Sequence, residues 1–236
     1  MKIFAYTMVY DTGFAPSVDK GVLSLACCKT FLRYKIANEL LDSSDDIYVV
    51  GLCGKQMSGR HNYDNDYFPV YIAKISDCVK TDYYYSKRAY KTRPDSQYLL
   101  ENGVWYFKKN NPHHIISDNK EIEELPNPNE EKDLFYIRGN KHEKNYVLIS
   151  TDYVYFGKYY SNNHFEVPPF LAKIGNKRKE ACRSDLSPIE ILNKKEQEEL
   201  VKFVFDNSKL FSKQNRNNTI DKYFIDRKSC GERSCR

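Results

Sequence analysis

A loop at Asp11 and two cations after it have the residue types and spacing of a phosphate-binding site. The segment Asp11-Thr12-Gly13-Phe14-Ala15-Pro16 places a carboxylate beside a glycine, and Lys29 and Arg33 follow it. If residues 29–38 form a helix, side chains four positions apart share one face, so Lys29 and Arg33 could hold one phosphate together. The alternative is a surface loop in which Asp11 caps a turn and both cations are solvated. No Gly-Lys-Ser or Gly-Lys-Thr follows a strand, so the loop is not a P-loop.

The histidine pair His113-His114, directly after Pro112, is a second candidate. Histidine titrates near neutral pH, so His113 could act as a general acid or base, and either ring could donate to a phosphate or to a base edge. Adjacent side chains point in different directions, so the two rings are a poor pair of ligands for one metal ion. The alternative is a solvated and inert pair in a loop.

Tyrosine is abundant, with 20 Tyr and 13 Phe against a single Trp. A tyrosine ring can stack on a base while its hydroxyl forms a hydrogen bond. Alternate residues of a strand share a face, so Tyr153 and Tyr155 could present two rings together. The run Tyr83-Tyr84-Tyr85 offers a second set of rings. Packing in the core or at a sheet edge is the alternative for both runs.

The surroundings of the seven cysteines indicate unreactive thiols, some buried and some exposed, rather than catalytic or metal-binding residues. Cys27-Cys28 stands among apolar residues, which favours buried thiols over an activated nucleophile. Cys182, Cys230 and Cys235 supply only three sulfurs, so a structural zinc site would need a fourth ligand such as His164. The sequence also has no dinucleotide fingerprint and no nucleophile elbow. We therefore expect no metal ion and no cofactor.

The elements that must position these residues are mostly short strands. Alternating or continuous β-favouring residues predict strands over 2–10, 47–51, 68–75, 105–107, 146–150 and 153–157. Residues 21–33 fit either a strand opened by Gly21 or part of a helix, and the proline-containing segment 110–133 fits a long loop. A helix over 81–90 would have Thr81 as its cap. Ser187 followed by Pro188 begins an amphipathic helix that reaches about residue 211.

This pattern predicts an α+β fold, with a mostly antiparallel sheet or a small β-barrel and a C-terminal helical extension. We expect one main domain over residues 1–171, followed over 172–236 by a basic linker, the amphipathic helix and a polar tail. The net charge of +5 is mild; it permits a nucleotide, DNA or RNA as partner without marking a dedicated nucleic-acid binder. No apolar stretch approaches the roughly 18 residues of a membrane helix, and no leader is evident, so we expect a cytoplasmic protein with reduced thiols.

Five blocks, in order, resemble the second nucleotide-modification-associated domain family of bacteria and phages. They are Asp11–Pro16 with Gly21–Lys29 and Arg33, then Asp46–Gly51, Val70–Ile75, Trp105–His114 and Val147–Gly157. The chain departs from the family pattern at Thr30, where the family has proline, and at Ser17, where it has asparagine. The resemblance covers about residues 1–171 and implies a link to modified nucleotides and to genes that modify DNA bases. It also suggests, by fold analogy, the small PUA- or EVE-like barrels that hold modified bases.

The resemblance and the residues together leave three functions open. The first is a module that binds or processes modified nucleotides in DNA base modification or phage defence. Lys29 and Arg33 would hold phosphate, a ring of Ser150–Tyr155 would hold the base, and Asp11 with His113 and His114 would read polar groups. The second is a hydrolase or transferase with His113 and Asp11 as its acid–base pair. The third is a scaffold that docks a partner protein through the helix over 191–210 and ignores nucleotides.

Overall fold

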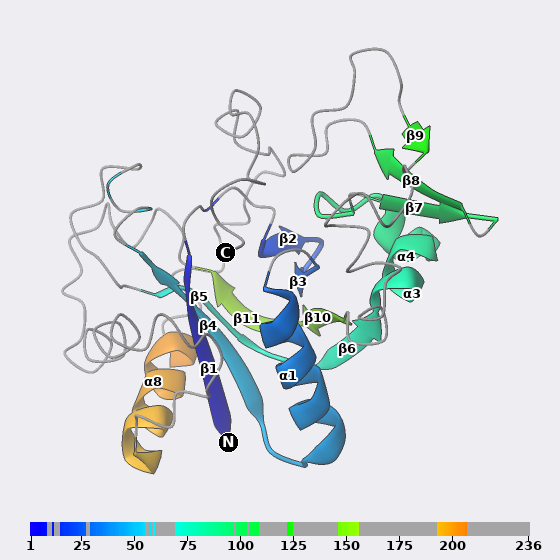
Figure 1. Cartoon of the computed structure of the whole chain (residues 1–236). Helices are drawn as coiled ribbons and strands as arrows, with labels where there is room; N and C mark the ends of the chain where they lie inside the picture. The colour runs from blue at the N-terminus through cyan, green and yellow to red at the C-terminus, as the bar shows by residue number, and fades with distance from the viewer. Residues whose placement is uncertain are drawn as a thin grey trace.

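Figure 1 shows the chain as a computed structural model, which describes residues 1–8, 11, 15–26, 29–54, 57, 59, 69–96, 98–102, 104–108, 122–124, 146–155 and 193–206. The described strands form three sheets, and four described helices of four or more residues accompany them.

The first sheet holds the centre of the core. Its strands are β1 (Lys2–Met8), β4 (Ile47–Cys53), β5 (Pro69–Lys74) and β11 (Asp152–Tyr155), in the spatial order β1-β4-β5-β11. β1 and β4 run parallel, and the two other pairs are antiparallel. Every residue of β4 is buried, which explains its unbroken apolar run, because a strand covered on both faces needs no polar side.

The second sheet contains β2 (Ser17–Asp19), β3 (Val22–Leu25), β10 (Tyr146–Ser150) and β6 (Asp77–Lys80), in the order β2-β3-β10-β6, and is antiparallel throughout. A two-residue turn joins β2 to β3. Both of its residues, Lys20 (φ 49°) and Gly21 (φ 76°), have the positive φ that such tight hairpin turns require.

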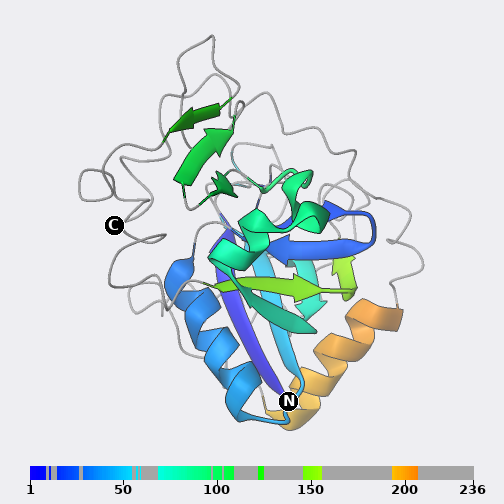
Figure 2. The ribbon, with the colours of Figure 1, turned by 90° about the vertical axis from the view of Figure 1, so that its right-hand side faces the viewer.

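Four helices connect and cover these sheets. α1 (Thr30–Asp42) lies in the crossover between the parallel strands β1 and β4, as parallel pairing requires, and packs against β10. α8 (Lys194–Asp206) lies on the other side of the first sheet from α1 (Figures 1 and 2). Leu200 of α8 is fully buried in the core, and Val201 and Phe203 pack partly against it.

The third sheet lies beside the short helices α3 (Thr81–Ser86) and α4 (Arg88–Lys91). Its antiparallel strands are β7 (Tyr98–Glu101), β8 (Val104–Lys108) and β9 (Ile122–Glu124). α3 packs against β7, and the buried tyrosines Tyr84, Tyr85 and Tyr98 form a small separate core there.

The predicted α+β class is confirmed, and the described strands form open sheets rather than a closed barrel. The predicted strands are found, that over 146–150 with its predicted bounds and those over 47–51, 68–75 and 105–107 with ends shifted by one or two residues. The ambiguous segment 21–33 divides into β3 and the start of α1. The helix predicted over 81–90 breaks at Lys87, whose backbone is extended, and Thr81 is not its cap, because Lys80 holds that position without a side-chain bond. Part of the predicted loop 110–133 is strand β9. The predicted boundary at residue 171 lies outside the described residues and stays a prediction.

Among the described residues, no helix is long and apolar enough to cross a membrane.

Candidate functional site

A row of three tyrosines and one glycine crosses the first sheet. Tyr6 of β1 pairs with Gly51 of β4, Gly51 with Tyr71 of β5, and Tyr71 with Tyr155 of β11. Directly paired residues in a sheet point to the same face, so these four residues form one line across it. We call them the tyrosine row. All three tyrosines are buried.

Gly51 allows two of these rings to meet. A Cβ atom at this position would lie 2.3 Å from a ring carbon of Tyr71 and 2.6 Å from the sulfur of Met8, which is too close for any side chain. The Tyr71 ring therefore lies over the glycine toward Tyr6. Its hydroxyl donates to that of Tyr6 over 3.0 Å, and the ring centroids are 6.2 Å apart in an edge-to-face arrangement.

Asp11 stands at one end of this row. Its side chain is 1% exposed, and the Tyr155 hydroxyl donates to Asp11 Oδ1, which joins two residues 144 positions apart in sequence. Because Asp11 follows the last residues of β1, the carboxylate lies near the carboxyl end of that strand. The surface-loop alternative for Asp11 is therefore not what the structure shows, since the carboxylate is buried and bonded.

Lys29 adds a positive charge beside the row. It is the residue before α1, its backbone is left-handed (φ 50°, ψ 39°), and its side chain is exposed. Its ammonium lies 5.9 Å from the centre of the Tyr6 ring, within the range of a cation–π contact. A buried carboxylate, three phenols and one exposed ammonium thus come together from β1, β5, β11 and the start of α1.

Arg33 does not join Lys29. It is 2% exposed, and its Nη1 donates to the backbone carbonyl of Tyr146 in β10. Lys29 and Arg33 do not share a helix face as expected. Lys29 precedes α1 and has a left-handed backbone conformation, so the two side chains do not follow one helical repeat. The structure gives Arg33 a contact between α1 and the second sheet.

The Tyr71 phenol of the row is a hydrogen-bond donor rather than a base. Burial raises the pKa of Tyr71, against a smaller opposing effect of its bond to Tyr6, so this phenol stays neutral far above physiological pH. Tyr153 lies two residues before Tyr155 and therefore on the same face. It is half-buried against the core, and burial raises its pKa, with Arg93 opposing the shift and Asp19 adding to it.

The predicted site residues His113 and His114 lie outside the described part of the chain. So do the residues for which the sequence favoured neither catalysis nor metal binding, namely Cys27, Cys28, His164, Cys182, Cys230 and Cys235. Within the described residues, no group of His, Cys, Asp and Glu is arranged to hold a metal ion. Burial raises the pKa of the Cys78 thiol, which makes it a poorer nucleophile than an ordinary cysteine.

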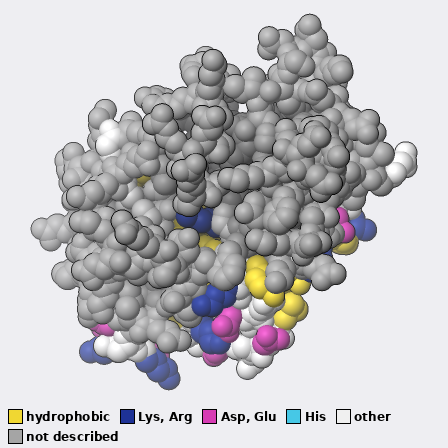
Figure 3. Space-filling view, viewed as in Figure 1, with side chains coloured by type: hydrophobic (Ala, Val, Ile, Leu, Met, Phe, Trp, Pro, Cys, Tyr) yellow, Lys and Arg dark blue, Asp and Glu magenta, His cyan; other side chains and the backbone are white. Residues whose placement is uncertain are grey.

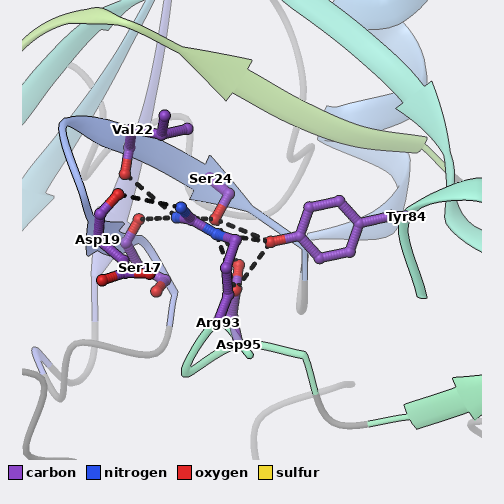
Figure 4. A network of polar contacts seen from close by, with 7 residues as sticks. All are labelled: Ser17, Asp19, Val22, Ser24, Tyr84, Arg93 and Asp95. Carbon is purple, nitrogen blue, oxygen red and sulfur yellow. Dashed lines mark hydrogen bonds and ion pairs between the residues drawn. The ribbon is translucent and has the colours of Figure 1, made fainter. Parts of the chain in front are cut away.

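A second buried polar cluster surrounds Arg93, a residue that no motif or spacing in the sequence singled out. The guanidinium is 6% exposed and donates five hydrogen bonds (Figure 4), to the Tyr84 hydroxyl, to the Ser24 hydroxyl and to the backbone carbonyls of Ser17, Asp19 and Val22. The fully buried carboxylate of Asp95 lies 3.6 Å from Arg93 Nε. It accepts from Ser24 over 2.6 Å and from Tyr84 over 2.8 Å.

This cluster, which we call the Arg93 cluster, ties the β2–β3 hairpin to the turn after α4. Nε and Nη1 each donate to one of these groups, and the two hydrogens of Nη2 serve three acceptors, so most of the five N–H groups of the guanidinium are engaged within the fold. Burial raises the pKa of Tyr84, so this hydroxyl also remains a donor. The geometry is that of a structural link between two parts of the fold.

Comparison with known proteins gives one result. The family described as nucleotide modification associated domain 2 matches residues 1–203, which include every described strand and most of α8. No curated protein and no solved structure matches the chain. The match confirms the resemblance found in the sequence blocks and extends it to the helix whose Leu200 is buried in the core. The chain therefore belongs to the nucleotide modification associated domain 2 family.

Proposed function

We propose that this protein binds a nucleotide with a modified base, and that the ligand contacts Asp11, Lys29 and the tyrosine row. The observation that carries the proposal is the tyrosine row itself, in which Tyr155 at one end donates to the buried Asp11 carboxylate and Tyr6 at the other end lies near the exposed Lys29 ammonium. Membership of the nucleotide modification associated domain 2 family supports the class of ligand. A carboxylate accepts hydrogen bonds, and the amino and imino groups of a base are donors.

Each group would have one part of the ligand to recognise. The Lys29 ammonium is a mobile point charge of the kind that holds a phosphate. Asp11 would accept from the N–H groups of the base, and a neutral phenol can donate to a base carbonyl. His113, expected from the sequence to be a further polar reader, belongs to this proposal as a prediction. A single cation of this kind suits a monophosphate better than a triphosphate, which needs more positive charge.

The test is a thermal-shift screen against canonical and modified nucleosides and nucleoside monophosphates. A ligand at a hundred times its dissociation constant stabilises by about 2.7 kcal/mol, which for a chain of this size corresponds to roughly 5–10 °C. We expect Asp11→Asn and Lys29→Gln to reduce this response strongly. Lys194→Gln, which removes an equal charge from the exposed start of α8, is the matched control and should retain it. A response that survives both site variants would refute the proposed site.

The hydrogen bond between Asp11 and Tyr155 also supports a second candidate function, that of an enzyme. Asp11 is the residue expected to form an acid–base pair with His113, and its hydrogen bond to a phenol gives it a fixed position for proton transfer. The measurement that separates the two candidates is chromatography of each ligand that gives a thermal shift, after long incubation with the protein. Binding alone leaves the nucleotide unchanged. An enzyme converts it and loses most of that conversion in Asp11→Asn.

A further inference from the structure

The tyrosine row has accessible side chains beside its two ends rather than along its length. Tyr6, Tyr71 and Tyr155 are 4%, 0% and 6% exposed. At the β1 end, Lys29 beside Tyr6 is exposed, and at the β11 end, Tyr153 is half-buried. Figure 3 shows basic and hydrophobic side-chain atoms next to one another near the middle of this face, around the position at which α1 begins in Figure 1. The strand order β1-β4-β5-β11 places the two ends three strand spacings apart, about 14 Å, so different parts of one ligand can meet them.

Tyr153 differs from the tyrosines of the row in its hydroxyl group. Tyr71 donates to Tyr6, and Tyr155 donates to Asp11. Tyr153 lies on the same face of β11 as Tyr155, yet its hydroxyl makes no hydrogen bond within the described residues. A phenol that packs partly into the core without a protein partner is left for water or for a ligand to bind.

The surroundings of Tyr153 favour an uncharged polar partner. β10 ends at Ser150, and β11 begins two residues later, so Tyr153 lies at the corner between the two sheets. Ser150 pairs with Leu23, close to the β2–β3 turn. Burial raises the pKa of Tyr153, and two charged residues of this neighbourhood have opposite effects on it, Arg93 lowering it and Asp19 raising it. The phenol is therefore neutral at physiological pH and lies near one charge of each sign, a setting that favours neither a cation nor an anion.

We propose that the Tyr153 hydroxyl bonds a hydroxyl-bearing substituent on the base of the nucleotide held at the tyrosine row. The phosphate lies at the β1 end with Lys29, and the base lies at the β11 end. Residues two positions apart on a strand are separated by about 7 Å, so Tyr153 and the Asp11–Tyr155 pair meet different edges of one base. A hydroxyl is the matching partner, because it both donates and accepts, as a neutral phenol does. A methyl group in the same place makes no such bond.

This inference rests on the proposed function, because it concerns the same site. It deepens that function by naming the kind of modified base, one with a polar rather than an apolar substituent. If the Tyr153 hydroxyl binds only water, the protein will not distinguish a hydroxymethyl group from a methyl group on the base.

The test is isothermal titration calorimetry with matched nucleotides. The probes are deoxycytidine monophosphates that carry a hydroxymethyl or a methyl group on C5, and the two corresponding deoxyuridine monophosphates. In at least one pair, the wild-type protein should bind the hydroxymethyl nucleotide more tightly by a factor of about 2–10, the effect of one neutral hydrogen bond. Tyr153→Phe should lose this preference and bind the methyl nucleotide with wild-type affinity. This variant keeps the ring and loses no hydrogen bond within the described residues, so it should unfold at the wild-type temperature.

The matched control is Tyr83→Phe, which removes the same hydroxyl from a ring of α3 that is 48% exposed, and it should retain the preference. Equal binding of the two members of both pairs by the wild-type protein would overturn the inference. A preference that persists unchanged in Tyr153→Phe would overturn it as well.

The inference and the proposed function can fail separately. Asp11→Asn should weaken the binding of all four probes, whereas Tyr153→Phe should change only the ratio within a pair. Binding without a preference, or a thermal shift with purine nucleotides alone, would refute the role of Tyr153 and leave the tyrosine-row site standing. No response to any nucleotide would refute the site itself.

Discussion

The tyrosine row with Asp11 and the Arg93 cluster are both buried polar groups in a small protein, yet they are built differently. In the Arg93 cluster, a guanidinium donates five hydrogen bonds, and the carboxylate beside it accepts two more. In the other region, the buried Asp11 carboxylate accepts from Tyr155, and the exposed Lys29 ammonium lies near the Tyr6 ring. The first arrangement is complete within the fold, whereas the second places an exposed cation beside buried donors and acceptors.

From this difference we infer that the Arg93 cluster serves the fold, and we propose that the Asp11 carboxylate serves a ligand. A buried ion pair contributes little net stability, but it is costly to break, because the remaining charge is buried without its partner. Arg93 and Asp95 therefore fix the position of the β2–β3 hairpin. The Asp11 carboxylate accepts a hydrogen bond from Tyr155, 144 positions later in the sequence, so its position depends in part on that contact. Variants that separate stability from nucleotide binding can test this distinction.

The largest effect is expected for Arg93→Met. This change leaves the Asp95 carboxylate fully buried without its cation, which costs about 3–5 kcal/mol. For a chain of this size the unfolding temperature should fall by on the order of 10 °C. The double variant Arg93→Met/Asp95→Leu, which removes both charges, should recover part of the loss in urea denaturation. If the folded fraction of Arg93→Met shows no thermal shift with the nucleotide, Arg93 belongs to the ligand site. The distinction between the two regions is then wrong.

Removing one tyrosine hydroxyl from the Arg93 cluster and one from the tyrosine row gives two variants that can be compared directly. Tyr84→Phe and Tyr155→Phe each take one donor from a buried carboxylate and should each cost about 1.5–3 kcal/mol, the contribution of a hydrogen bond to a charged group. Only Tyr155→Phe should weaken nucleotide binding, because Asp11 loses its position. The readout is the midpoint of urea unfolding together with the thermal shift caused by the ligand. Equal effects of the two variants on ligand binding would show that the response follows stability alone.

A third variant tests how the tyrosine row is assembled. Gly51→Ala places a Cβ atom where the Tyr71 ring lies, and the displaced ring should cost about 1–3 kcal/mol. It should also weaken nucleotide binding, since Tyr71 can no longer reach Tyr6. Gly59→Ala is the control, because a Cβ atom there meets no heavy atom within 4 Å, and it should be neutral in both measurements. A wild-type ligand response in Gly51→Ala would remove Tyr71 from the site.

Much of the framework could be predicted from local sequence pattern. The runs at β1, β4, β5 and β10 combine β-favouring residues with turn residues at their ends, so the strands were identifiable without the structure. The parallel pairing of β1 with β4 was not identifiable, because the residues 21–33 fit both a strand and a helix and the crossover depended on that choice. The break at Lys87 was also missed, since no glycine or proline marks it.

Some residues of the candidate site were also candidates in the sequence. Asp11, Lys29 and Tyr155 were singled out by residue type and by family resemblance, and the structure brings them together with Tyr6 and Tyr71, which were not singled out. Their meeting depends on the strand order β1-β4-β5-β11, a long-range property that no local pattern encodes. The same reason explains why Arg33 was misjudged, because its partner is a carbonyl 113 positions away.

The smallest expected effect concerns alkaline pH and involves one phenol from each region. Burial raises the pKa of both Tyr71 and Tyr84 above the unfolded value of about 10. Above pH 10 the unfolded chain releases these protons while the folded protein keeps them, so each phenol lowers the stability by at most about 1.4 kcal/mol per pH unit as the pH rises. Tyr71→Phe and Tyr84→Phe should each make the decline of the unfolding free energy above pH 10 less steep, as measured by urea denaturation. Tyr84→Phe could make the decline of the unfolding free energy less steep while Tyr71→Phe leaves it unchanged. In that case water reaches the tyrosine row but not the Arg93 cluster. That result would separate the two regions more clearly, as a ligand site and a structural link.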